Sequence, residues 1–195
     1  MNILERLKHG TRAEHLALEA SLPLLHPDLT LEQYAAVLRA FAGVVLPLER
    51  RLAALPWPAA LDYPARRHTP ALQADLGALG LSAPEFALPH TLATTLPAAY
   101  GTLYVLEGST LGGQLIRRHL KQHLKLDTGS GAAYFSGYGP DTGAKWRVFG
   151  QVLLECAQSD SPVEHRASTM ANEIVQEARM AFGAFSAAVA GWEVL

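Results

Sequence analysis

The aliphatic residues of this chain are almost all alanine and leucine. The sequence holds 32 Ala and 32 Leu, but only 3 Ile and 10 Val. Alanine and leucine are strong helix formers, whereas β-branched residues favour strands. This bias predicts an all-α fold. The length of 195 residues suits a single domain that covers residues 1–195.

Charge and cysteine content exclude several classes of protein. The net charge is −2 and the isoelectric point is near 6.4, so we expect no broad basic surface for nucleic acid or anionic lipid. The single cysteine, Cys156, excludes an internal disulfide and a cysteine-based metal cluster. The start of the chain lacks the apolar core of a signal peptide, and the most apolar stretch, 180–192, is shorter than the roughly 18 residues of a membrane span. We therefore expect a cytoplasmic protein with no membrane partner.

Six helical segments follow from apolar spacing and end signals. Thr30 and Gln33 form a capping box for the second helix, and Ser161 followed by Pro162 is a strong start for the last. Glycine and aromatic residues between Asp127 and Gly143 predict a loop, and the prolines between Pro56 and Pro64 a connection within one domain. The predicted helices cover residues 2–20, 30–55, 70–79, 92–125, 144–158 and 161–192.

The first helix carries a histidine on its apolar face. At 100° per residue, His15 falls within an arc of about 80° together with five other side chains, so helical geometry aims it into the core. These five are Leu4, Leu7, Thr11, Leu18 and Leu22. Glu19 lies one turn later, where side chains meet. A neutral imidazole can bind a metal through one nitrogen while a carboxylate orients the other. The simpler alternative is a core histidine hydrogen-bonded to Glu19.

Two cations flank this histidine on the same helix. Lys8 and Arg12 lie one to two turns before His15. They could meet an anionic group at the edge of whatever His15 contacts. Basic residues of an amphipathic helix are also commonly solvated, so both interpretations stay open.

The segment from Tyr100 to Gln114 places glycines inside a helix. Gly108 and Gly112 each project within about 20° of the direction of Gly101, and Gly113 is adjacent. Each glycine in a helix interior costs about 1 kcal/mol relative to alanine, so packing must offset several kcal/mol. Either a second helix makes close backbone contact here or a flat ligand lies on the helix. The spacing alone favours neither.

The other candidate metal-binding and cysteine motifs of the sequence are incomplete. His119 and His123 are one turn apart, but no glutamate follows His119 as in the zinc-protease motif. No Glu-x-x-His occurs, which disfavours a di-iron bundle. Cys156 lies in an apolar helical pattern and is expected to be a small core residue.

Three motifs together resemble the biliverdin-producing heme oxygenases, especially their bacterial branch. The first is Thr11-x-x-x-His15-x-x-x-Glu19. The second is the glycine-rich segment 103–114, and the third is the aromatic segment 134–139 followed by Trp146. They occur in the order of the family and span most of the chain, and the second is the most specific.

The resemblance implies a heme oxygenase-like helical bundle that holds heme between a proximal N-terminal helix and a glycine-rich distal helix. It implies that His15 is the iron ligand and that Glu19 and Thr11 lie beside it. The distal helix would contribute four positions at the reacting face: Gly108, Ser109, Gly112 and Gly113. The heme propionates would meet three cations: Lys8, Arg12 and Arg147.

The implied activity is oxidative cleavage of heme to biliverdin with release of carbon monoxide and ferrous iron. Heme is both cofactor and substrate, O2 is the oxidant, and no flavin or iron–sulfur motif is present. Electrons are therefore expected from a separate reductase or ferredoxin-type protein, which a basic cluster could dock: Arg117, Arg118, Lys121 and Lys125. That cluster is equally consistent with a solvated surface. A phytochrome is one conceivable acceptor of the biliverdin.

One position departs from many members of the family. Ser109 stands where they carry an aspartate that organises water for proton delivery. A serine hydroxyl donates and accepts hydrogen bonds but is not acidic near neutral pH. Bacterial relatives share the Glu-Gly-Ser pattern, so activity is still expected. The alternative is a heme-binding or heme-sensing protein on the same fold without turnover.

Overall fold

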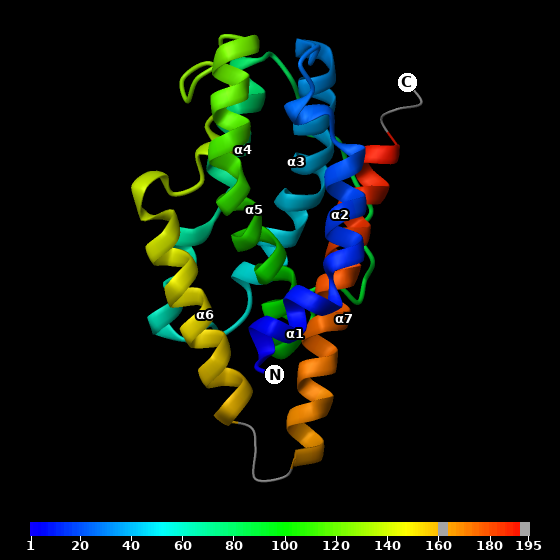
Figure 1. Ribbon diagram of the computed structural model, residues 1–195, viewed down its shortest axis with the longest axis vertical. Coiled ribbons are helices and arrows are strands. Elements are labelled where there is room, and N and C mark those ends of the chain that lie inside the picture. Colours follow the sequence, from blue (N-terminus) through cyan, green and yellow to red (C-terminus); the bar gives the residue numbers. More distant parts are fainter. Residues whose placement is uncertain (160–163, 192–195) are drawn as a thin grey trace.

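The computed structural model describes residues 1–159 and 164–191, and these residues contain helices and turns but no strand (Figure 1). This confirms the all-α fold class. The α-helices are α1 (Ile3–Gly10), α2 (Arg12–Ser21), α3 (Leu31–Ala53), α4 (Thr69–Ala78), α5 (Leu96–His123), α6 (Thr142–Ser159) and α7 (Glu164–Ala190). Short 3-10 turns include η1 (Pro23–Leu25), η3 (Tyr63–Arg66) and η4 (Tyr134–Ser136).

Helix α7 is the element on which most of the bundle packs. Helices α5, α3, α2 and α1 all contact it, and α5 does so most extensively. Helix α4 packs on α3, and α6 packs on α5 and α1. Figure 1 shows α3, α5 and α7 running through the length of the molecule, with the N-terminus near the crossing of α1 and α7. The two helices with predicted ligand contacts, α2 and α5, are thus held by a common neighbour.

The first predicted helix is two helices that meet at Thr11. The Thr11 backbone, with φ −113° and ψ 6°, leaves the helical region. Its buried hydroxyl donates to the Leu7 carbonyl at 2.8 Å, a back-bond that commonly bends helices. A Cβ on Gly10 would lie 2.6 Å from Val175 Cγ1, so the break lies close against α7. The periodicity counted from Leu4 therefore does not continue unchanged into α2.

Helix α3 follows the sequence prediction closely. The Thr30 hydroxyl accepts from the Gln33 N–H, and the Gln33 side chain accepts from the Thr30 N–H, which completes the capping box. The helix continues through Pro47. By length and composition α3 could cross a membrane, but 56% of its most apolar window is buried inside the fold. The most apolar helical window of the described residues is thus in α3, and not in 180–192 as we expected.

Helices α5 and α7 approach each other at a glycine. A Cβ on Gly101 would lie 2.1 Å from the Ile174 carbonyl oxygen and 2.8 Å from the Ala178 nitrogen. Only a residue without a side chain fits there. The helix starts at Leu96, later than predicted, because the Thr95 hydroxyl caps the Ala98 N–H. It runs without interruption through all its glycines.

The loop after α5 and the last helix lie close to their predicted positions in the sequence. Residues 127–143 form turns, and α6 begins within them at Thr142. The Asp75 carboxylate of α4 fixes this loop by accepting from the N–H groups of Ala133 and Tyr134, at 2.7 and 2.8 Å. The predicted cap of the last helix, at Ser161 and Pro162, lies outside the described residues.

Candidate functional site

Helices α2 and α5 both expose apolar side chains beside residues that the sequence singled out. Leu16 of α2 is 51% exposed, and Leu111 and Leu115 of α5 are 47% and 56% exposed. Leu111 and Leu115 lie one turn from Gly108 and Gly112 on the same face of α5. Exposed large apolar residues on one helix face, such as Leu111 and Leu115, are typical of a binding surface.

The glycine face of α5 is open at two positions. A Cβ on Gly112 would meet no atom within 4 Å, and one on Gly108 would meet only the Trp146 ring, at 4.0 Å. Each glycine nevertheless lowers helix stability by about 1 kcal/mol relative to alanine. Packing within the protein does not require these two glycines, and their face of α5 leaves room for a flat ligand.

The other two glycines of the segment have a different role. Gly101 makes the close contact with α7 described above. Gly113 is buried, and a Cβ there would lie 2.5 Å from the Phe135 carbonyl oxygen. Close packing, the first of the two explanations left open by the sequence, therefore applies to Gly101 and Gly113, whereas Gly108 and Gly112 leave an open face.

His15 lies on the surface of α2 and not in the core, contrary to our expectation. Its side chain is 52% exposed. The break at Thr11 is the cause, because it reorients α2 so that Leu18 is the only buried apolar residue of that helix. The predicted partner is in place, since His15 Nε2 lies 3.5 Å from Glu19 Oε1. The Phe182 ring of α7 meets the imidazole edge-on, with ring centroids 5.7 Å apart, and supports it from behind.

The start of α2 is tied to α5. Thr11 is buried, and its hydroxyl lowers the pKa of the neighbouring Tyr104 phenol, although burial raises that pKa more. The Thr11 carbonyl also accepts the N–H of His15 at 2.9 Å. Thr11 therefore fixes the beginning of the helix that carries His15. The structure shows it as an anchor between helices.

The three predicted propionate partners are exposed. Lys8 of α1, Arg12 of α2 and Arg147 of α6 are all solvent-accessible. Arg147 follows Trp146, the residue whose ring reaches the Gly108 position. Helix α1 in turn packs on α6. The cations thus come from three neighbouring elements at the α1 end of the bundle.

A buried ionic cluster lies behind the distal segment, and sequence reasoning missed it. Glu107, fully buried, accepts from Arg66 Nη1 at 2.8 Å and from the Tyr138 hydroxyl at 2.7 Å. The Tyr138 hydroxyl also lies 3.3 Å from His68 Nε2. Burial raises the pKa of Glu107, and the adjacent Arg66 opposes that shift. Burial lowers the pKa of His68, which favours the neutral imidazole.

This cluster fixes the residue immediately before Gly108. Arg66 also donates to the carbonyls of Leu61 and Lys145, so a single guanidinium joins the proline-rich connection, α5 and α6. One signal could have found it: Glu107 is a carboxylate inside an otherwise apolar helical run, and buried carboxylates require a partner.

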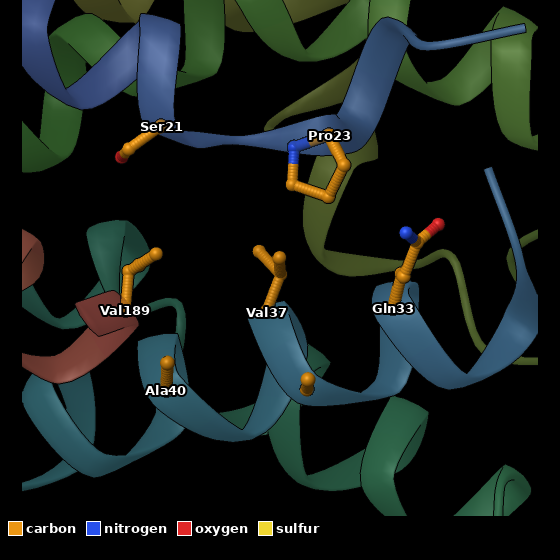
Figure 2. A pocket seen from close by; sticks show the side chains of 7 residues that line it. Ser21, Pro23, Gln33, Val37, Ala40 and Val189 are labelled. Atoms are coloured by element: carbon orange, nitrogen blue, oxygen red, sulfur yellow. The ribbon is translucent and has the colours of Figure 1, made fainter. Parts of the chain in front are cut away.

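A cavity of about 350 Å³ lies at the far end of α2 (Figure 2). Its walls come from the α2–η1 junction, α3 and α7. The lining residues are Ser21, Pro23, Gln33, Ala36, Val37, Ala40 and Val189. Most of these side chains are small or apolar, so the cavity adds apolar space beside the helix that carries His15.

No cluster of three or more His, Cys, Asp or Glu side chains that could hold a bare metal ion occurs in the described ranges 1–159 and 164–191. An open face of glycine and leucine on α5 and an accessible histidine on α2 fit a metal that arrives inside a flat organic ring, because the ring supplies the remaining ligands. The residues present therefore fit heme.

Comparison with known proteins agrees with this geometry. The heme oxygenase family model matches residues 1–190. A heme oxygenase of Xanthomonas campestris is 35% identical over 132 residues, which cover 66% of this chain and 76% of that protein.

Solved structures share the fold. The heme oxygenase of Neisseria meningitidis, solved with bound NO and CO, superposes with a TM-score of 0.80 at 23% identity, over 100% of this chain and 94% of that one. The heme complex of a heme oxygenase from the cyanobacterium Synechocystis superposes with a TM-score of 0.71 at 18% identity, over 100% and 95%. The family match along nearly the whole chain and the shared fold lead to one conclusion: this chain belongs to the heme oxygenase family.

Proposed function

We propose that this heme oxygenase binds its substrate between α2 and α5 and opens the ring to biliverdin, with release of carbon monoxide and ferrous iron. The observation that carries the proposal is the open face of α5 at Gly108 and Gly112, which internal packing does not explain. Both helices are held by α7, and the contact of Thr11 with Tyr104 ties the start of α2 to α5.

Each predicted residue has a role in this arrangement. His15 is the iron ligand, and Glu19, whose Oε1 lies 3.5 Å from His15 Nε2, orients the imidazole. Gly108 and Gly112 let the backbone of α5 approach the ring. Lys8, Arg12 and Arg147 form ion pairs with the propionates at the solvent edge.

When bound, heme supplies the iron at which O2 is reduced and the ring carbon that is oxidised. The protein contributes position and proton supply. Leu16, Leu111 and Leu115 exclude water from the ring faces, which strengthens the polar contacts inside the site. Ser109 donates to the Leu106 carbonyl at 2.7 Å, so its oxygen is oriented as an acceptor.

Electrons come, in this proposal, from a separate reductase or ferredoxin-type protein. The last turns of α5 and the segment just after them carry four exposed cations: Arg117, Arg118, Lys121 and Lys125. An acidic donor protein matches such a surface by charge. A biliverdin acceptor such as a phytochrome would act after product release.

Replacing Ser109 tests the role of the distal helix. Replacing Ser109 with alanine removes one neutral hydrogen-bonding group, which costs about 0.5–1.5 kcal/mol. We expect the single-turnover rate of biliverdin formation to fall about three- to twelvefold, with heme affinity unchanged. The measurement is the rate of loss of the heme absorption bands under O2 with a chemical reductant.

Ser130→Ala is the control for this measurement. Ser130 exchanges hydrogen bonds only with Asp127 in the loop after α5, so its loss affects the loop and not the α5 face. Its rate should equal that of the unaltered protein. A complete block in Ser109→Ala with heme still bound would show that the hydroxyl is essential and that its role as an organiser of water is wrong.

A further inference from the structure

The backbone carbonyl of Gly10 lies where α1 ends and the chain turns into α2. Carbonyls in the last turn of a helix lack partners further along that helix, so they bond to other groups. The Gly10 carbonyl accepts a hydrogen bond from Nε of Arg179, a residue of α7, at 2.6 Å. A side chain of α7 therefore holds the chain one residue before the break at Thr11.

The Arg179 guanidinium also contacts the other side of the break. Its Nε lies 3.3 Å from Glu14 Oε1 in the first turn of α2, and Glu14 directly precedes His15. Nε carries one proton, which goes to the Gly10 carbonyl, so the contact with Glu14 is an ion pair. The two side chains are 47% and 33% exposed, so solvent weakens this pair, and the hydrogen bond to Gly10 is the stronger contact.

Three residues of α7 form a row beneath the break and the histidine. Val175, Arg179 and Phe182 are spaced by four and three residues, so they lie on one face of α7. Val175 Cγ1 lies 2.6 Å from the point that a Cβ on Gly10 would occupy. At the other end of the row, the Phe182 ring meets the His15 imidazole edge-on, with centroids 5.7 Å apart. Arg179 lies between them and adds a hydrogen bond, which is directional where the apolar contacts are not.

We propose that Arg179 is a positioning residue for the iron ligand, which acts by holding the start of α2 at the angle that places His15 over Phe182. This inference rests on the proposed function. Leu18 is the single buried apolar residue of α2, so core packing alone fixes the direction of this helix weakly. A helix free to tilt presents His15 correctly in only a fraction of the molecules, and the apparent heme affinity falls with that fraction.

The first test is the heme affinity of Arg179→Met. Methionine keeps an apolar stem and removes the guanidinium, and the site is about half exposed, so the variant should fold. We expect the affinity to fall about three- to twelvefold, the range for the loss of one hydrogen bond. Arg179→Lys keeps a charged donor and should bind heme more tightly than Arg179→Met. Titration of the heme absorption band measures the affinity of each variant.

Two further measurements separate positioning of the ligand from stability of the fold. In the heme-free protein, amide hydrogen exchange in α2 should be faster in Arg179→Met, because the start of the helix is no longer held. In the ferrous heme complex, the iron–histidine stretching frequency from resonance Raman spectroscopy should shift, because His15 meets the iron at another angle. A residue that only stabilised the fold would leave this frequency unchanged once heme is bound.

Arg6→Met is the matched control. Arg6 Nη2 donates to Asn172 Oδ1 at 2.7 Å, so this arginine also joins α1 to α7, but it lies before the break and through that bond contacts no residue of α2. Its heme affinity and stretching frequency should equal those of the unaltered protein. Unchanged values in Arg179→Met, equal changes in Arg179→Met and Arg6→Met, or an Arg179→Lys affinity no higher than that of Arg179→Met would overturn the inference. Failure of the unaltered protein to bind heme would instead refute the proposed function.

Discussion

Replacing Arg66 with methionine should lower the free energy of unfolding by about 3–5 kcal/mol, because it leaves a buried carboxylate without its cation. Arg66 and Glu107 are 2% and 0% exposed and lie 2.8 Å apart. Methionine keeps the apolar stem, so the change isolates the guanidinium. Chemical denaturation followed by circular dichroism gives the value.

Two further variants make this result specific. Arg67 is 40% exposed and lies 3.7 Å from Glu49, so Arg67→Met should cost less than about 1 kcal/mol. Adding Glu107→Leu to Arg66→Met removes the stranded charge and should restore much of the loss. A cost below 1 kcal/mol in Arg66→Met itself would mean that the ion pair does not hold the distal segment.

Replacing Gly112 with leucine should weaken heme binding about 5- to 150-fold, since forcing a side chain into an occupied contact costs about 1–3 kcal/mol. Without heme, the new side chain meets no atom within 4 Å of its Cβ, so the helix should keep its stability or gain it. Titration of the heme absorption band measures the affinity, and thermal unfolding of the heme-free protein measures stability.

Gly183→Leu is the matched control. Gly183 is an exposed interior glycine of α7, and a Cβ there also meets nothing within 4 Å. Both substitutions therefore add the same side chain at an open position inside a helix. They differ in the helix that carries the new side chain. Equal heme affinities for Gly112→Leu and Gly183→Leu would contradict the assignment of the α5 face.

The sequence predicted those features of the fold that local chemistry determines. The capping box at Thr30 and the glycine-rich helix are written in neighbouring residues, and both are present. The bend at Thr11 was not predictable by counting, because periodicity assumes one continuous helix. That single break moved His15 from the expected core to the surface of α2.

The site was predictable only in part for a related reason. The glycines could be found in the sequence because each one lowers the stability of a helix. Whether a glycine permits close packing or leaves an open face depends on which neighbour lies over it, and the sequence does not show that. Pairing of Arg66 with Glu107 joins residues far apart in the chain. No spacing rule connects such residues, so only the packed fold brings them together.

The central claim is that heme binds at α5 with His15 as its iron ligand, and His15→Ala tests it most directly. The unaltered protein should bind heme one to one with the absorption spectrum of histidine ligation. His15→Ala should lose that spectrum, and added imidazole should restore it by filling the space of the missing ring. An unchanged spectrum in His15→Ala would remove His15 from this role and would contradict the account of the site.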